Sequence, residues 1–162
     1  MRSWRLTVGA RMCDYCDCRS HPAISALSAD HEVLLDLLDA LLASVAMDER
    51  AQARVLVVHL HDVLHDHATR EERGVFTQLR RELRDETYVT MFERDHEVLH
   101  GLLDACAGDA WQQAARELVE LLREHILREE TDLFPAAHQM LEPSHWNAVD
   151  AAVLESAASG RS

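Results

Sequence analysis

The sequence has few of the residues that break or flatten a helical chain. Its 162 residues include five glycines, three prolines and only 5% aromatic residues. This scarcity disfavours a turn-rich β fold, and the abundance of Leu, Ala, Glu, Arg and Asp favours helices. The length suits one domain with its own hydrophobic core. The composition therefore predicts a single all-α domain.

Long apolar runs and excess positive charge are also missing. No apolar stretch approaches the roughly 20 residues of a membrane-spanning helix. The formal net charge of −13 argues against nucleic acid or anionic membrane as a partner and is compatible with attracting cations. The basic N-terminal stretch has an apolar part too short and broken for a secretory signal, and Met12 is an alternative start. We therefore expect a cytoplasmic protein that binds neither nucleic acid nor membrane.

The cysteines gather near the N-terminus. In a reducing compartment they are expected as thiols or metal ligands rather than disulfides. Three of them and one imidazole fall within nine residues, namely Cys13, Cys16, Cys18 and His21. This cluster is a candidate zinc or iron site, although its spacing is compact for four ligands. A redox-active thiol cluster and a tail without function are the alternatives.

Apolar residues recur at helical spacing along most of the chain. A first helix is expected from about Ile24, and others are expected over about 51–83, 85–107 and 110–134. A short fifth helix begins near Pro143 and runs to about Leu154. Residues 1–22 are expected to be irregular and residues 158–162 frayed. Long amphipathic helices with short links predict an antiparallel up-down-up-down four-helix bundle over residues 23–157.

The chain contains an internal repeat. DHEVLLDLLDA at residues 30–40 returns as DHEVLHGLLDA at residues 95–105, with nine of eleven positions identical. HATREERGVF at 67–76 likewise matches HILREETDLF at 125–134 at His, Arg, Glu, Glu and Phe. The repeating unit is a helix hairpin, so two hairpins are expected to pack with pseudo-twofold symmetry. The copies differ where the second has His100 and the first has Leu35.

Both copies place polar residues on the face that should form the core. Residues four apart in a helix project from the same side, which applies to two His-x-x-x-Glu pairs and one His-x-x-x-His pair. Such groups are costly to bury unless they are paired or bind metal. The candidate ligands are His31, His67, Glu71, His96, His100, His125 and Glu129.

Imidazole and carboxylate ligands suit iron, manganese or zinc, and two carboxylates from opposing helices can bridge two ions. Five histidines do not divide evenly between two ions. We expect one ion to take three histidines and the other to take two, with both glutamates bridging. Because Leu35 replaces a sixth histidine, the second ion would keep an open position for a small molecule. The proposed division is His96, His100 and His125 for one ion, and His31 and His67 for the other.

These residues have two other interpretations. A single buried histidine is more often a hydrogen-bonded core residue than a ligand, but four helices carry these residues in repeat register. A ferritin-like carboxylate site needs Glu-x-x-His on two helices. Only Glu93 and His96 have that spacing, so the ferritin-like site is disfavoured.

Taken together, the motifs resemble the hemerythrin-like, or HHE cation-binding, domain over about residues 24–142. The resemblance rests on the candidate ligands above and on the phrase EETDLFPAA at 129–137. Hemerythrins have His-x-x-x-x-Asp in the last helix, where this sequence has Glu130 at the Asp position and the better-phased Glu129 before it. This departure is similar to bacterial hemerythrin-like proteins and argues against simple reversible oxygen storage.

The resemblance implies a non-haem centre of two Fe ions with an oxo or hydroxo bridge. Such a centre would bind, sense or process dioxygen, nitric oxide or peroxide, with electrons from a donor that the sequence does not identify. Whether it turns over as an enzyme is left open. The main alternative is an iron-responsive regulatory or interaction module whose bundle is stabilised by metal. A di-zinc or di-manganese protein and an iron-storage protein are further alternatives, and the ligand count argues against storage.

Overall fold

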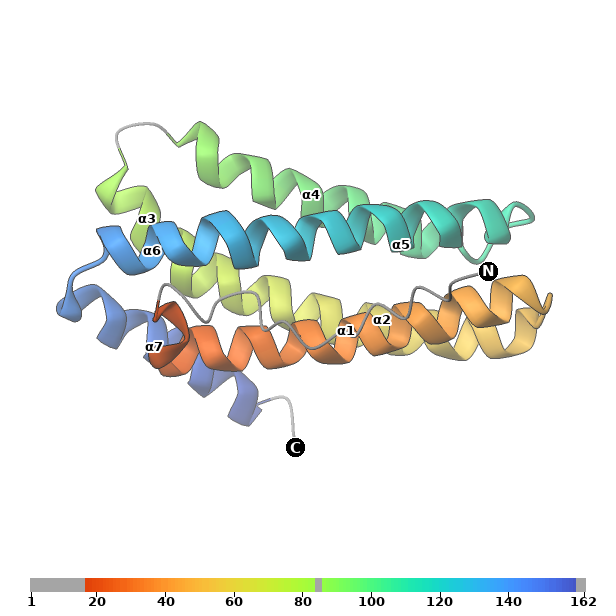
Figure 1. The fold of residues 1–162 in the computed structure, drawn as a ribbon, viewed down its shortest axis with the longest axis horizontal. Coiled ribbons are helices and arrows are strands. Elements are labelled where there is room, and N and C mark those ends of the chain that lie inside the picture. The colour runs from red at the N-terminus through yellow and green to blue at the C-terminus, as the bar shows by residue number, and fades with distance from the viewer. Residues whose placement is uncertain (1–16, 84–85, 160–162) are drawn as a thin grey trace, which may run out of the picture.

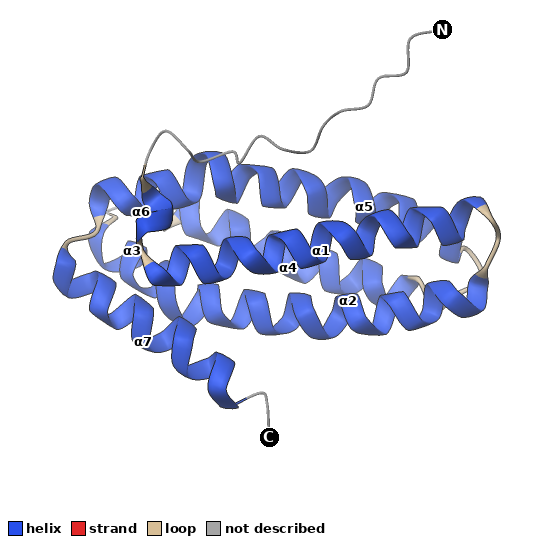
Figure 2. Ribbon diagram, turned by 60° about the horizontal axis from the view of Figure 1, so that its bottom comes forward, coloured by secondary structure: helices blue, strands red, loops and turns tan. Residues whose placement is uncertain are grey.

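The computed structural model describes residues 17–83 and 86–159, which are almost entirely helical and contain no strand (Figure 2). The all-α prediction is confirmed for this part of the chain. The elements in order are η1 (Cys18–Ser20), α1 (Pro22–Ala46), α2 (Arg50–Glu71), η2 (Glu72–Phe76), α3 (Thr77–Glu82), α4 (Thr87–Ala105), α5 (Trp111–Arg128), η3 (Glu129–Leu133), α6 (Phe134–Met140) and α7 (Pro143–Ser159).

These elements form long rods that lie side by side as a helical bundle (Figure 1). α1 and α4 are two of the rods. The other two are composite, because a π-helical turn, η2 or η3, joins α2 to α3 and α5 to α6. α1 packs against α2 and α5, and α4 packs against α5 and α2. Each hairpin of the repeat is thus one α-helix and one composite rod.

The last rod runs further than the sequence predicts. Its expected end was Phe134, before Pro135, but the helix continues as α6 to Met140. Proline lacks the N–H that an α-helix interior requires. η3 ends at Leu133, two residues before Pro135, and its π-helical hydrogen bonds already interrupt the regular α-helical pattern there. The π-helical turn therefore lets the rod pass through Pro135.

The structure describes the ends of the chain only in part. Residues 1–16 and 160–162 lie outside the described residues. The short turn η1 precedes α1, which begins at Pro22, the residue type favoured at the first helical position. The predicted fifth helix is present as α7 and extends past the expected Leu154 to Ser159.

α7 crosses the end of the bundle obliquely and packs on η2, α1 and α2 (Figure 2). The close approach to η2 depends on Gly74. A Cβ atom built on this residue would lie 2.9 Å from Cγ2 of Val153 in α7 and 3.5 Å from the carbonyl oxygen of Val149. The absence of a side chain at residue 74 therefore allows α7 to cover the π-helical turn.

The hydrophobic core is divided into two clusters. One contains Leu34, Leu38, Leu64 and Leu99, and the other contains Ile24, Leu27, Phe76, Phe92 and Phe134 with the inner face of α7. On α1, His31 stands between the last residue of one cluster and the first residue of the other. On α4, His96 stands likewise between Phe92 and Leu99. A polar layer thus separates two apolar cores.

None of the helices in the described residues combines the length and the apolarity that crossing a bilayer would require.

Candidate metal centre

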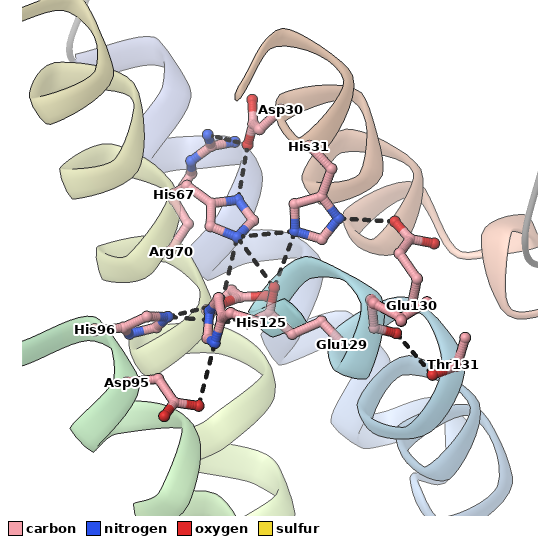
Figure 3. A network of polar contacts seen from close by, with 12 residues as sticks. Asp30, His31, His67, Arg70, Asp95, His96, His125, Glu129, Glu130 and Thr131 are labelled. Atoms are coloured by element: carbon pink, nitrogen blue, oxygen red, sulfur yellow. Dashed lines mark hydrogen bonds and ion pairs between the residues drawn. The ribbon is translucent and has the colours of Figure 1, made fainter. Parts of the chain in front are cut away.

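The polar layer is made of residues from all four rods (Figure 3). Each of its side chains is at most 3% exposed. α1 and α4 each supply one histidine, and each composite rod supplies one histidine and one glutamate a turn later. The layer contains six of the seven residues that the sequence predicts as ligands: His31, His67, Glu71, His96, His125 and Glu129.

The two glutamates occupy equivalent places beside the π-helical turns. Glu71 is the last residue of α2, directly before η2, and Glu129 is the first residue of η3. π-helical turns are rare and often occur at functional sites. Both copies of the repeat thus change helical geometry at the point where a carboxylate enters the core.

The six side chains form two groups that share both carboxylates. His31 and His67 complete one group, His96 and His125 complete the other, and in each group the ligand atoms lie within 4.8 Å of one another. Each glutamate has two carboxylate oxygens, so each can contact two cations. The geometry is that of two overlapping ligand groups, each with two imidazoles and the same two carboxylates.

The distances inside each group are short. Nε2 of His31 lies 3.0 Å from Glu129 Oε2, and Nε2 of His67 lies 3.5 Å from Glu71 Oε2. In the second group, Nε2 of His96 lies 3.4 Å from Glu71 Oε2. All four histidines therefore point the same ring nitrogen, Nε2, at the carboxylates in the centre.

Several of these atoms lack partners. Both oxygens of Glu71, both oxygens of Glu129 and Nε2 of His96 and His125 are buried and have no hydrogen-bond partner among the described residues. Nε2 of His125 comes within 2.7 Å of Glu129 Oε1, but not with the geometry of a hydrogen bond. Two buried carboxylates without hydrogen bonds would carry a large desolvation penalty. Bound cations would offset this penalty, so the donor set fits metal ions.

The outer ring nitrogen, Nδ1, of each of the four histidines in the layer also has a partner. Nδ1 of each ring contacts a carboxylate, and since an ionised carboxylate only accepts hydrogen bonds, Nδ1 carries the proton and donates. This leaves the lone pair of Nε2 directed at the centre, the arrangement that metal-binding histidines show in proteins. The pairs are His31 with Glu130 at 2.8 Å, His67 with Asp30 at 3.3 Å, His96 with Glu72 at 2.9 Å and His125 with Asp95 at 3.4 Å.

The supporting role of these four carboxylates was not predicted from the sequence. A signal for them exists, because each copy of the repeat has Asp directly before His in its first helix and two adjacent glutamates in its second. Three of the four are held in turn by arginines. Arg70 contacts Asp30, Arg128 contacts Asp95, and Arg19 contacts Glu130 at 3.0 Å.

The electrostatics of the layer favour positive charge. Burial alone would lower the pKa of His31, but the nearby carboxylates of Glu129 and Glu130 outweigh it and raise the pKa to about 10. Burial likewise opposes protonation of His96, while Glu129, Glu71 and Glu72 raise its pKa to about 11. Burial would raise the pKa of Glu129, but His125 and the other histidines hold it well below its usual range. The carboxylates thus attract positive charge, as protons or as metal ions.

The two halves of the centre differ in their access to solvent. The side chain of Glu130, behind His31, is 4% exposed and is covered by Arg19 from η1. The side chain of Glu72, behind His96, is 43% exposed and lines a cavity of about 440 Å³. This cavity reaches His96 itself and is otherwise lined mainly by polar residues, including His65, Glu93, Glu97 and His100. The open side of the centre is therefore the side of His96, where the cavity is lined by residues of both α2 and α4.

The structure does not bring His100 into the centre. His100 belongs to neither ligand group and lies half-buried beside two exposed histidines of α2. A residue four positions after His96 is rotated by about 40° around the helix, and this rotation moves its ring to the edge of the bundle. The two ligand groups thus contain two histidines each, and the assignment of His100 to one of the ions stays a prediction. Leu35, its counterpart in the first copy, is also half-buried.

The N-terminal cluster is described only in part. Cys13 and Cys16 lie outside the described residues. Cys18 is fully buried in the second apolar cluster, and the ring of His21 stacks on Trp146 with centroids 3.6 Å apart. Nε2 of His21 also lies 3.0 Å from Nδ1 of His138. The structure thus places Cys18 in η1, which packs against α1 and α6, and His21 against Trp146 of α7, and neither residue belongs to the two ligand groups.

The fold and the buried layer together define an all-helical protein with a His/Glu metal site in its core. The family model of the hemerythrin HHE cation binding domain matches residues 23–137, and the chain belongs to this family. The match spans all six residues of the layer, and membership implies the binding of metal, namely iron. No curated protein and no solved structure matched the sequence.

Proposed function

We propose that the protein binds two iron ions and uses them to bind, sense or redox-process dioxygen, nitric oxide or peroxide. The observation that carries this proposal is the sharing of Glu71 and Glu129 between two ligand groups whose buried atoms otherwise lack partners. When bound, a pair of iron ions supplies reversible one- or two-electron chemistry toward such small molecules. The same family membership supports the antiparallel up-down-up-down order of the four rods.

The residues of the chain have distinct tasks in this function. The four histidines hold the ions through Nε2, and the carboxylates behind them fix each ring and its tautomer. Glu71 and Glu129 bring negative charge that offsets the charge of two cations. The two apolar cores above and below the layer exclude water from it. The chain thus supplies a rigid, dry and anionic site.

Access of a small molecule is best supported on the side of His96. Each group offers four protein residues, whereas iron accepts up to six ligands, so positions for an outside ligand remain. The cavity beside Glu72 and His96 is large enough for a diatomic molecule or peroxide. We assign entry to this cavity rather than to the side of His31, which Arg19 and Glu130 close.

A second candidate function is a metal-dependent regulatory module in which a partner responds to the folded bundle. The location of the polar layer favours it, because the layer separates the two apolar cores and metal binding would join them. Folding and metal binding are strongly coupled in such sites. A small-molecule ligand would then be unnecessary, and no turnover would occur.

Rapid mixing of the anaerobic, iron(II)-loaded protein with dioxygen, nitric oxide or peroxide tests the proposal. The expected result is that at least one of these reagents produces a visible absorption band, and that a Glu129→Gln variant does not show this band. If the reagent is dioxygen or peroxide, adding a reductant should remove the band. An unchanged spectrum with all three reagents would contradict it. If metal removal then greatly increased protease sensitivity, the regulatory function would be favoured. We further propose a cytoplasmic setting, an electron donor that supplies the reducing equivalents, and no nucleic-acid or membrane partner.

A further inference from the structure

A second group of histidines lies at the edge of the bundle, outside the buried centre. His61 and His65 are one turn apart on α2, and His100 comes from the adjacent α4. The three ring centroids are separated by 6.1 Å between His61 and His65, 5.5 Å between His61 and His100, and 5.9 Å between His65 and His100. Each ring therefore contacts the other two.

This arrangement is close to that of three imidazoles on one metal ion. With zinc–nitrogen bonds of about 2.0–2.1 Å and tetrahedral angles, the ring centroids of two zinc-bound imidazoles lie about 5 Å apart. In the buried centre, the pairs His31–His67 and His96–His125 have centroids 4.7 Å and 4.9 Å apart. The outer rings need to close by about an ångström, and His61 and His65 are exposed and can rotate.

The bundle does not need histidines at these positions for its fold. In the other half of the repeat, the residues equivalent to His61, His65 and His100 are Val119, Arg123 and Leu35. The same packing of an α-helix on a composite rod thus forms without any of the three imidazoles. Their gathering on one side only distinguishes the two halves of the protein.

The electrostatics of His100 and the shape of the surface around it agree with metal binding. Burial, followed by the proximity of His61 and His65, lowers the pKa of His100. The cavity of about 440 Å³ that reaches His96 is lined by His65 and His100 together with Glu93 and Glu97. An ion held by the three rings would stand at the rim of this cavity.

We propose that His61, His65 and His100 form a separate site for one borderline divalent cation, with Zn²⁺ as the representative ion. Three imidazoles occupy three tetrahedral positions, and the fourth faces solvent at the cavity. Imidazole ligands and a tetrahedral arrangement suit zinc. This site is independent of the iron in the core, because it shares no residue with either ligand group.

A zinc titration of the iron-loaded, full-length protein against a chromophoric chelator tests the site. Cys13→Ser and Cys16→Ser are present in every sample, so that these thiols do not bind the zinc. We expect one equivalent of Zn²⁺ per chain and no loss of iron. His100→Leu, which installs the residue of the first repeat copy, and His61→Ala should each weaken zinc binding by about tenfold or more.

His59→Ala is the matched control, since His59 is exposed on the same helix but does not contact the cluster. It should leave zinc affinity unchanged. The site is refuted if no saturable zinc binds, if zinc uptake displaces an equal amount of iron, or if His100→Leu binds zinc as tightly as the parent. The last outcome would mean that His61 and His65 act alone. Far-UV circular dichroism and iron content verify that each variant is folded.

Discussion

Nε2 of His31 and Nε2 of His67 lie 3.1 Å apart in the core of the bundle, although the two residues come from different helices. Both rings donate their Nδ1 protons outward, to Glu130 and Asp30. Two lone pairs so directed repel each other unless a positive species lies between them. In the metal-free protein a proton serves this purpose, consistent with the raised pKa of His31, and a metal ion serves it better.

Substituting single histidines on α4 distinguishes residues that bind iron from residues that do not. His96→Leu should remove a ligand and lower the iron content clearly below two per chain, because its Nε2 faces Glu71. His100→Leu should leave iron content and the visible spectrum unchanged, since His100 belongs to neither group. Elemental analysis of the two purified variants measures this. Equal loss of iron in both would restore His100 as a ligand.

The carboxylates behind the histidines should tune metal affinity without contacting metal. Asp95→Asn weakens the hold on Nδ1 of His125, and we expect iron affinity to fall by about 10–100-fold. Asp104→Asn, at an exposed position of the same helix, is the control and should have no effect on iron. Competition with a chelator measures both variants. An Asp95→Asn protein with parental affinity would contradict the assigned role.

Metal removal should change the sign of the pH dependence of stability. In the metal-free protein the pKa values of His31 and His96 are raised from 6.5 to about 10 and about 11. Their contribution to stability is full below pH 6.5 and is lost as the pH rises through these folded-state values. The pKa of Glu130 is lowered from 4.5 to about 2, so its contribution is full above pH 4.5 and is lost as the pH falls toward 2.

The metal-free protein should therefore be most stable between about pH 4.5 and 6.5 and should weaken toward pH 9. The metal-loaded protein should instead gain stability from pH 6 to 8, because metal binding requires deprotonated ligands. Urea unfolding of both forms at several pH values measures this difference. A metal-free protein whose stability rises between pH 6.5 and 9 would show that the buried histidines are not held protonated.

The packing of α7 on the π-helical turn η2 can be tested by adding a single methyl group at residue 74. Gly74→Ala places a methyl group 2.9 Å from Val153 and should destabilise the protein by about 1–3 kcal/mol, less the gain in helix propensity. Gly101→Ala on α4 is the matched control. Its Cβ meets nothing within 4 Å, so it should be stabilising by up to about 1 kcal/mol. Chemical denaturation measures both, and equal effects would contradict the close approach of α7.

Much of this architecture can be predicted from the spacing of residues along single helices. The apolar stripe of α1 predicts which face is buried, and the interruption of that stripe by His31 predicts a polar layer. Repetition of His-x-x-x-Glu predicts Glu71 and Glu129 as the central carboxylates, and both lie in the two buried groups. These features depend on helical periodicity alone, which a sequence shows directly.

Contacts between helices are harder to predict. Asp30 supports His67, a residue of the next helix, and only the packing of α1 on α2 brings them together. His100 lies at the boundary between the buried and the exposed face of α4, where helical spacing alone allows its ring to turn toward the core or toward the edge of the bundle. The packing of α4 on α2 determines the position of this ring, which contacts His61 and His65. The π-helical turns also have no simple sequence signal and were not predicted.

The central claim is that the shared carboxylates of Glu71 and Glu129 bind two metal ions. An anaerobic titration of the metal-free protein with iron(II), followed by elemental analysis after desalting, tests it most directly, with Glu129→Gln and the exposed Glu124→Gln as paired variants. The account predicts retention of about two irons per chain in the parent and in Glu124→Gln, and clearly fewer in Glu129→Gln, since Glu129 belongs to both groups. Retention of no iron by the parent, or of equal iron by Glu129→Gln, would contradict it.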